Sequence, residues 1–204
     1  MTLVDLTRQI ISSEVDDYFD DDTIVFHLNN CVDDIISLAL RQEFTSNRGI
    51  RALDDLRASQ AVTITSPTAY GSVFTKSENK PSDFYEVLFV ELGKVQSVHV
   101  NKSSLNKILT GILVPTSNEY YHTIGNETFT FYLPTNVSVS GSIDYIKEPP
   151  SILKVATELP SLPKRLKTAV VYGAAVKLLM QEKYTENVQP FQATYNSQLQ
   201  INLW

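Results

Sequence analysis

Few side chains in this sequence have the types and spacing that catalysis or metal binding requires. The three histidines, His27, His99 and His122, are scattered along the chain. His27 and Cys31 are four residues apart on an expected helix, so one face of that helix would carry two metal ligands. A zinc site needs more ligands than these, and a cysteine within an apolar stripe is more often part of the core. We therefore expect no metal site and no cofactor.

An acidic run is the other candidate for chemistry. Six of the nine residues from 14 to 22 are carboxylic acids: Glu14, Asp16, Asp17, Asp20, Asp21 and Asp22. The run lacks the glycine and the alternating aspartates of a calcium-binding loop, so it predicts a solvated turn. The sequence also contains no nucleophile elbow, no glycine-rich phosphate loop and no His-Glu-x-x-His pair. We expect no catalytic residues and a protein that is not an enzyme.

Composition and charge set further limits. The chain of 204 residues is 43% hydrophobic and 20% charged, which is ordinary for a globular protein with one domain, or with one domain and an insertion. A net charge of −6 argues against tight binding of nucleic acid, and the single cysteine excludes an internal disulfide. We expect synthesis in a cytoplasm and no membrane span, because we find no secretory signal and no long apolar run.

The N-terminal quarter of the chain is expected to be helical. Thr2 and Asp5 have the spacing of a capping box, which predicts a helix over residues 3–13. A strong 3.6-residue apolar pattern predicts a second helix over residues 23–44, which Asp21 or Asp22 would cap. Residues 50–57 would add two further helical turns.

The pattern changes to that of strands at residue 61. Strands are predicted at 61–65, 95–100, 120–124, 128–133 and 137–147, the last three as an antiparallel series. Residues 66–82 have the composition of a loop. Residues 83–92 are ambiguous, since their aromatic and β-branched content favours a strand whereas Ser82 and Gly93 resemble helix caps; we favour a helix. A short helix is predicted at residues 103–109.

Two proline-marked passages separate the last strand from the most apolar helix of the chain. This helix is predicted to begin near Ser161 or Leu162, with Pro163 in its first turn, and to extend to Met180. It is apolar nearly all round, as buried helices are.

A last helix is predicted from Pro190, with an apolar stripe that ends at the final residue. The stripe and that residue are Phe191, Tyr195, Leu199, Leu203 and Trp204. These residues could simply pack on the two N-terminal helices, or they could dock on another chain. The terminal tryptophan favours docking, because chain ends fray unless something binds them and aromatic residues are enriched at interfaces.

Together these elements predict an α+β fold. Helices from the N- and C-terminal parts of the chain would form a helical bundle, with an antiparallel β-rich region inserted between them. We expect one discontinuous domain of residues 1–60 and 151–204, the helical base. The inserted β-rich region would comprise residues 61–150.

The order of these parts resembles that of the head-to-tail connector (adaptor, ring or neck) proteins of tailed bacteriophages. The resemblance extends over most of the chain in layout, but none of its stretches is a catalytic fingerprint. The stretches that carry it are Asp21-Asp22-Thr23-Ile24-Val25-Phe26-His27-Leu28-Asn29-Asn30-Cys31, Ser142-Ile143-Asp144-Tyr145-Ile146-Lys147-Glu148-Pro149-Pro150, Leu159-Pro160-Ser161-Leu162-Pro163 and Val170-Val171-Tyr172-Gly173-Ala174-Ala175-Val176-Lys177-Leu178-Leu179.

The resemblance implies a structural virion protein at the head–tail junction. Copies would form a ring, commonly of twelve, below the portal protein. The ring would bind further tail or neck proteins and continue the channel through which DNA passes without sequence-specific binding. The C-terminal segment would dock on the portal or on a neighbouring subunit, and the acids of residues 14–22 would line the channel.

Two other classes of protein remain open. One is a small intracellular enzyme, a hydrolase or a nucleic-acid-processing enzyme, with a pocket around His99 or His122. The other is an intracellular binding module, which would form no symmetric oligomer.

Overall fold

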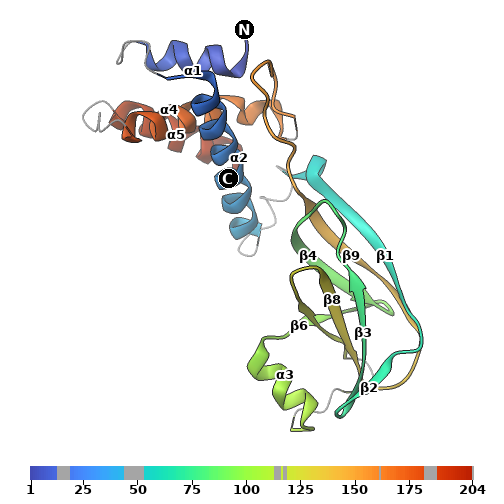
Figure 1. Ribbon diagram of the computed structural model, residues 1–204. Coiled ribbons are helices and arrows are strands. Elements are labelled where there is room, and N and C mark those ends of the chain that lie inside the picture. The colour runs from blue at the N-terminus through green and yellow to red at the C-terminus, as the bar shows by residue number, and fades with distance from the viewer. Residues whose placement is uncertain are drawn as a thin grey trace. The chain divides into compact units, whose positions relative to one another are not determined.

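The computed structural model describes residues 1–12, 19–43, 53–112, 116, 119–160, 162–181 and 188–203. The chain forms two compact units, which Figure 1 shows as ribbons. The helical unit comprises Met1–Leu56 and Pro149–Trp204, and the β unit comprises Arg57–Glu148. The predicted α+β fold is confirmed, since helices from both ends of the chain pack together and antiparallel sheets are inserted between them in the sequence.

The first helix, α1 (Leu3–Ile11), has the predicted capping box. The Thr2 hydroxyl accepts a hydrogen bond of 3.0 Å from the Asp5 N–H, and the Asp5 carboxylate accepts one of 2.8 Å from the Thr2 N–H. Two N–H groups at the helix start are thereby satisfied.

The second helix, α2 (Asp21–Glu43), begins two residues before its predicted start. The Asp20 carboxylate caps it by accepting a hydrogen bond of 2.6 Å from the Thr23 N–H. The prediction of Asp21 or Asp22 as the cap was wrong, because both lie within the first turn. Their negative charges still favour the positive end of the helix dipole.

Length and composition alone would let Asp21–Arg41 of α2 cross a lipid bilayer. Half of that stretch is buried inside the structure, however, and the core helix of a water-soluble protein meets the same criteria. The buried apolar residues recur at helical spacing. They are Ile24, Leu28, Cys31, Val32, Ile35, Ile36, Ala39 and Leu40.

The centre of the helical unit is α4 (Lys167–Gln181), on which α1, α2 and α5 (Val188–Leu203) all pack. Nine of its fifteen residues are buried, so it is the core helix that the sequence predicted. In α5, Pro190 lies in the first turn, where its missing N–H costs no hydrogen bond.

The predicted start of this core helix, Ser161 or Leu162, was six or five residues before the observed start at Lys167. Pro163 has extended backbone angles (φ −52°, ψ 140°), and its ring disfavours a helical conformation at Leu162. A short 3-10 helix, η3 (Lys164–Leu166), follows the proline, and α4 begins only after it.

The β unit consists of two sheets. The first has the strand order β1 (Arg57–Ile64), β9 (Val139–Lys147), β4 (Phe84–Leu92) and β5 (Val95–Gln96). The second has the order β2 (Thr68–Tyr70), β3 (Val73–Asn79), β8 (Thr128–Leu133), β7 (Tyr121–Ile124) and β6 (Val98–His99). Neighbouring strands are antiparallel except β6 and β7, which are parallel.

Both sheets contribute to one apolar core, which consists of Val62, Ile64, Val90, Leu92, Phe129, Phe131, Leu133 and Ile143. The helix α3 (Lys102–Leu109), which was predicted, is capped by Asn101, whose side chain accepts a hydrogen bond of 2.9 Å from the Ser104 N–H. A second cluster includes α3: Val73, Val100, Ile108, Tyr121 and Tyr132.

Two predictions for the middle of the chain were wrong. Residues 66–82 are not a loop but contain β2 and β3. All three residues of β2 are exposed at a sheet edge, and Val73 is the one buried residue of β3, so these strands lack the alternation of apolar residues by which a strand is recognised in the sequence. Residues 83–92 form β4 and not a helix. Register shifts around Tyr85 and Leu88 interrupt the alternation of β4, so the two-residue signature of a strand is lost from the sequence.

Other boundaries depend on strand pairing that local patterns do not specify. The strand β1 begins at Arg57, so only the 3-10 helix η2 (Asp54–Leu56) remains of the predicted turns at 50–57; residues 50–52 lie outside the described ranges. The strand predicted at 95–100 is divided into β5 and β6, in different sheets. In the predicted antiparallel series β7 pairs with β8, but β9 joins the other sheet.

Gly173 allows three helices to meet. A Cβ at this position would overlap the Cys31 sulfur of α2 and lie 2.9 Å from a ring carbon of Tyr195 in α5. Replacement of Gly173 by leucine should therefore lower the free energy of unfolding by about 1–3 kcal/mol through overpacking. An unchanged midpoint of urea unfolding would contradict this placement.

Gly141 has a similar role in the β unit. A Cβ there would overlap the Glu91 carbonyl and lie 2.9 Å from the Leu92 Cα, because β9 and β4 are in close contact. We expect Gly141→Ala to lower the free energy of unfolding by roughly 1–3 kcal/mol in urea titrations. Gly125→Ala is the matched control: its Cβ would lie 3.4 Å from the Thr128 carbonyl oxygen, an ordinary contact, and should change little. Equal effects of the two substitutions would argue against the steric explanation.

Candidate functional site

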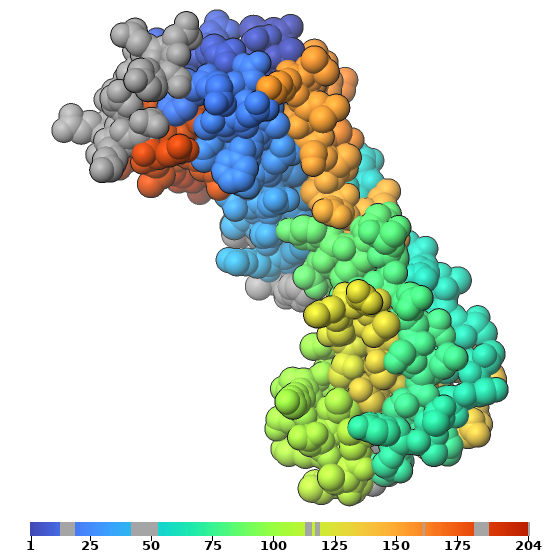
Figure 2. Space-filling model, in the orientation of Figure 1, coloured from blue at the N-terminus to red at the C-terminus, as the bar shows by residue number. Residues whose placement is uncertain are grey.

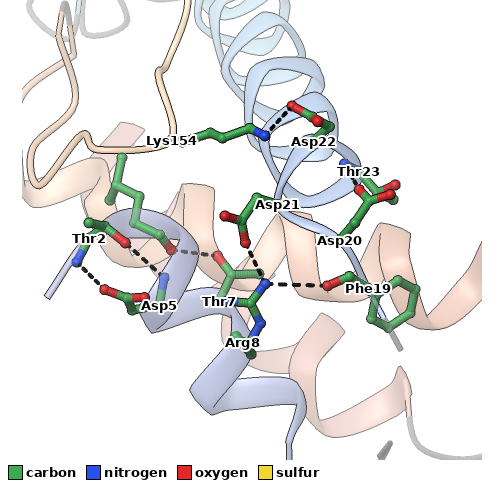
Figure 3. Close-up of polar contacts among 11 residues, drawn as sticks. Thr2, Asp5, Thr7, Arg8, Phe19, Asp20, Asp21, Asp22, Thr23 and Lys154 are labelled. Atoms are coloured by element: carbon green, nitrogen blue, oxygen red, sulfur yellow. Dashed lines mark hydrogen bonds and ion pairs between the residues drawn. The ribbon is translucent and has the colours of Figure 1, made fainter. Parts of the chain in front are cut away.

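The start of α2 holds three of the six acids that the sequence suggested for a channel lining. Figure 3 shows that each of the three has a partner within the helical unit. Asp20 caps α2, Asp21 forms an ion pair of 2.6 Å with Arg8, and Asp22 forms one of 2.8 Å with Lys154. The other three acids, Glu14, Asp16 and Asp17, lie outside the described residues.

Arg8 connects α1 to the beginning of α2. Besides its ion pair with Asp21, its guanidinium donates a hydrogen bond of 3.3 Å to the Phe19 carbonyl. The paired side chains are partly exposed, so this ion pair is expected to contribute at most about 1 kcal/mol. The hydrogen bond from the Thr23 N–H is the main cause that lowers the pKa of Asp20, which keeps this carboxylate charged.

Residues 151–157, which we call the strap, are bound along α2 and α1. The Asn29 side chain makes two hydrogen bonds with the Ile152 backbone: its oxygen accepts one of 2.7 Å from the N–H, and its amide donates one of 3.4 Å to the carbonyl. The ion pair of Lys154 with Asp22 and a 2.8 Å hydrogen bond from the Leu3 N–H to the Ala156 carbonyl complete the attachment. The strap therefore has a defined conformation without being a helix or a strand.

The strap was not singled out in the sequence. Asn29 occurs in one of the stretches that carry the family resemblance, but its partner Ile152 is 123 residues away. The run Ile152-Leu153-Lys154-Val155 does not alternate between apolar and polar residues, so no local pattern in the sequence marks the strap.

The predicted docking residues of the C-terminal helix face the helical unit. Leu199 and Leu203 are buried, whereas Phe191 and Tyr195 are partly buried. The ring centroids of Phe191 and Tyr172 are 6.2 Å apart, which places Phe191 against α4. Trp204 lies outside the described residues.

Tyr195 has the deepest contact of these residues. Its ring and the Cys31 thiol lie on Gly173, and burial raises the pKa of both groups, to about 12 for Cys31. The stripe thus packs within its own chain, mainly on α4, and of the two N-terminal helices Tyr195 meets Cys31 of α2.

Two of the histidines suggested for a pocket or a metal site, His27 and His122, have structural contacts, whereas His99 is exposed. The His27 ring nitrogen Nε2 is 2.8 Å from the Gln181 side-chain oxygen. The His122 nitrogen Nδ1 is 3.0 Å from the Ser97 hydroxyl, and both residues are buried. Among the residues that the structure describes, no group of three His, Cys, Asp or Glu side chains could hold a metal ion.

An open depression of about 440 Å³ lies elsewhere in the β unit. Its lining consists of Lys80, Pro81, Ser82, Phe84, Tyr85, Asn126 and Glu127. It therefore includes neither Ser97 nor a histidine, and its lysine ammonium lies 4.5 Å from the centre of the Phe84 ring. The depression is closer in its arrangement to an open hollow on the protein surface between strands than to a catalytic pocket.

His122 makes the β unit sensitive to acid. Burial, with a smaller contribution from His99, lowers the pKa of His122 from its ordinary value of 6.5 to about 4. The unfolded chain binds this proton more readily than the folded chain does. The contribution of neutral His122 to the free energy of unfolding is therefore complete above pH 6.5 and is lost as the pH falls toward 4. We expect a loss of about 2 kcal/mol in unfolding free energy between pH 7 and pH 5.

Urea unfolding at several pH values, with His122→Gln as the control, measures this effect. The variant should lack this part of the pH dependence while keeping the contribution of all other groups. A pH dependence that is identical in the two proteins would refute the assignment to His122.

Comparison with known proteins identifies the family. The model of the SU10 adaptor protein family matches residues 1–202, which is nearly the whole chain. A comparison with curated proteins gave no match. The matched family is one of structural adaptors and not of enzymes. The chain therefore belongs to the SU10 adaptor protein family, a family of phage head–tail adaptors.

Proposed function

We propose that this adaptor forms a ring below the portal protein of a tailed phage and continues the DNA channel from head to tail. The observation that carries the proposal is the family match over residues 1–202, which implies an adaptor role and binding to neighbouring head or tail proteins. Twelve copies are proposed from the resemblance to connector proteins. The ring would be a virion component that performs no catalysis.

Two parts of the chain are proposed to have different roles, and the borders of the two compact units support this division. We propose a helical base of residues 1–60 and 151–204 and an inserted β-rich region of residues 61–150. The compact units have their borders at Leu56 and Glu148, close to these limits. The helical base would provide the contacts that close the ring, and the β-rich region would contact the next tail component.

The charge of the chain supports a channel without tight DNA binding. Carboxylates repel phosphate groups, so an acidic lining would let DNA slide. Asp22 is the best described candidate, because its carboxylate is largely exposed despite the pair with Lys154. We also propose such a role for Asp20 and Asp21, and for the three acids of residues 14–17.

The C-terminal helix is proposed to dock on the portal or on a neighbouring subunit. Because Leu199 and Leu203 are buried within the helical unit, the docking surface of the described part of α5 would be its outward side. Deletion of α5 would be a poor test, because it would expose the apolar surface of α4.

A binding experiment with the portal protein of the same phage tests this function. The purified chain and the portal protein, alone and mixed, are measured by native mass spectrometry, with the portal of an unrelated phage as the control. We expect several adaptor copies, twelve if the proposed number is right, on each cognate portal ring. Absence of binding, together with a gold label on the chain away from the head–tail junction in virions, would overturn the proposal.

A further inference from the structure

The strap presents large apolar side chains to solvent. Leu153 is 65% exposed and Val155 is 77% exposed. Figure 2 shows the strap (orange) on the surface of the helical unit, beside α2 (blue). Exposed apolar side chains that gather at one place often mark an interaction surface.

Phe26 of α2 belongs to the same surface. It is 60% exposed and shares one helix face with Asp22 and Asn29, from which it is separated by four and three residues. Asp22 binds Lys154 and Asn29 binds Ile152, so the strap runs antiparallel to α2 here. Leu153 is the residue between the two bound strap residues, and Phe26 lies between their two partners along α2. We call Phe26, Leu153 and Val155 the ridge.

The ridge is held in place by polar contacts that do not depend on its apolar side chains. The strap is attached through the Ile152 backbone, the Lys154 ammonium and the Ala156 carbonyl. Polar residues at positions 153 and 155 would leave all of these contacts intact. A rigid support lowers the entropy cost of binding, so the ridge is prepared for a partner.

The outward side of α5 is a second unusual surface. None of the sixteen residues of α5 is charged, although 20% of the whole chain is. The exposed residues include Ile201, which is 71% exposed, and two small ones, Ala193 and Ser197. The other exposed residues are Gln189, Pro190, Asn196 and Gln200. Depletion of charged residues is a feature of interface cores.

The charges beside the two surfaces are opposite. Near the ridge, Asp5, Asp20 and Asp22 are carboxylates at the starts of α1 and α2. Lys154 of the strap pairs with Asp22, so Asp5 and Asp20 are the carboxylates without an ion pair among the described residues there. Near α5, the 3-10 helix η3 packs on that helix and carries Lys164 and Arg165. Both of these cations are exposed, and neither has an ion-pair partner within the described ranges.

We propose that the ridge of one copy packs on the uncharged side of α5 in the next copy. The proposal rests on the ring function above and names the surfaces that close the ring. A contact between two different surfaces of one chain is heterologous, and repetition of such a contact generates a ring when the rotation closes. Lys164 and Arg165 would then face the carboxylates at the edge of the ridge. These opposite charges would favour the pairing of ridge with α5 over other pairings of two copies.

Cysteine crosslinking in the assembled, portal-bound ring tests the pairing. Two variants, Val155→Cys and Ile201→Cys, are mixed and treated with a short bis-maleimide; the native Cys31 is buried and does not compete. We expect crosslinked dimers from the mixture and none from either variant alone. Ile112→Cys, equally exposed but in the β unit, replaces Ile201→Cys in the control mixture and should give no dimers. Dimers of Val155→Cys alone, or none from the mixture although the ring forms, would overturn the proposal.

Polar substitution of the ridge gives an independent readout. Val155→Ser should weaken association between copies about ten-fold, the loss expected when one buried valine contact is removed, without a change in the urea midpoint. Ile112→Ser should have no effect. If Val155→Ser forms the ring normally, the proposed pairing is wrong and the ring function stands. If it loses only portal binding, the ridge is a portal surface and the pairing is also wrong. If the unaltered chain fails to bind the portal, the ring function itself fails.

Discussion

The helical unit depends on the close approach of α2 and α5 to α4 at Gly173. The Cys31 sulfur and the Tyr195 ring occupy the space that a side chain at this position would need. Helices from the two ends of the sequence are thereby packed against one buried helix. Close-packed interiors transmit small changes in volume, so the directions in which α2 and α5 present their outer sides depend on this contact.

Polar contacts attach the exposed segments to this packed centre. Asp20 caps α2, Arg8 joins α1 to α2, and Asn29 holds the strap through its backbone. The three described acids of the suggested channel lining, Asp20, Asp21 and Asp22, therefore have structural roles in the single chain. For Asp22 both roles are compatible, because its carboxylate is exposed while it pairs with Lys154.

An adaptor works through its surfaces, and this explains why the sequence contains no catalytic motif. A docking surface can be built from ordinary large apolar residues on a rigid support, and it needs no fixed sequence motif. Leu153 and Val155 are common residue types, and only their exposure on the attached strap distinguishes them from core residues. His122, which suggested a pocket by its residue type, is instead a buried and neutral part of the β unit.

The sequence by itself determined the helices at both ends of the chain, α3, β7 and β8, because caps and local periodicity are sufficient for such elements. It also determined the α+β layout from which the adaptor family was inferred. Only the tertiary structure decided that β4 is a bulged strand, that β9 pairs with β1 and β4, and that the stripe at Phe191 to Leu203 packs on α4. The strap likewise depends on a contact between residues 123 positions apart. Strand partners and burial are set by residues distant in the sequence, and local patterns therefore could not specify them.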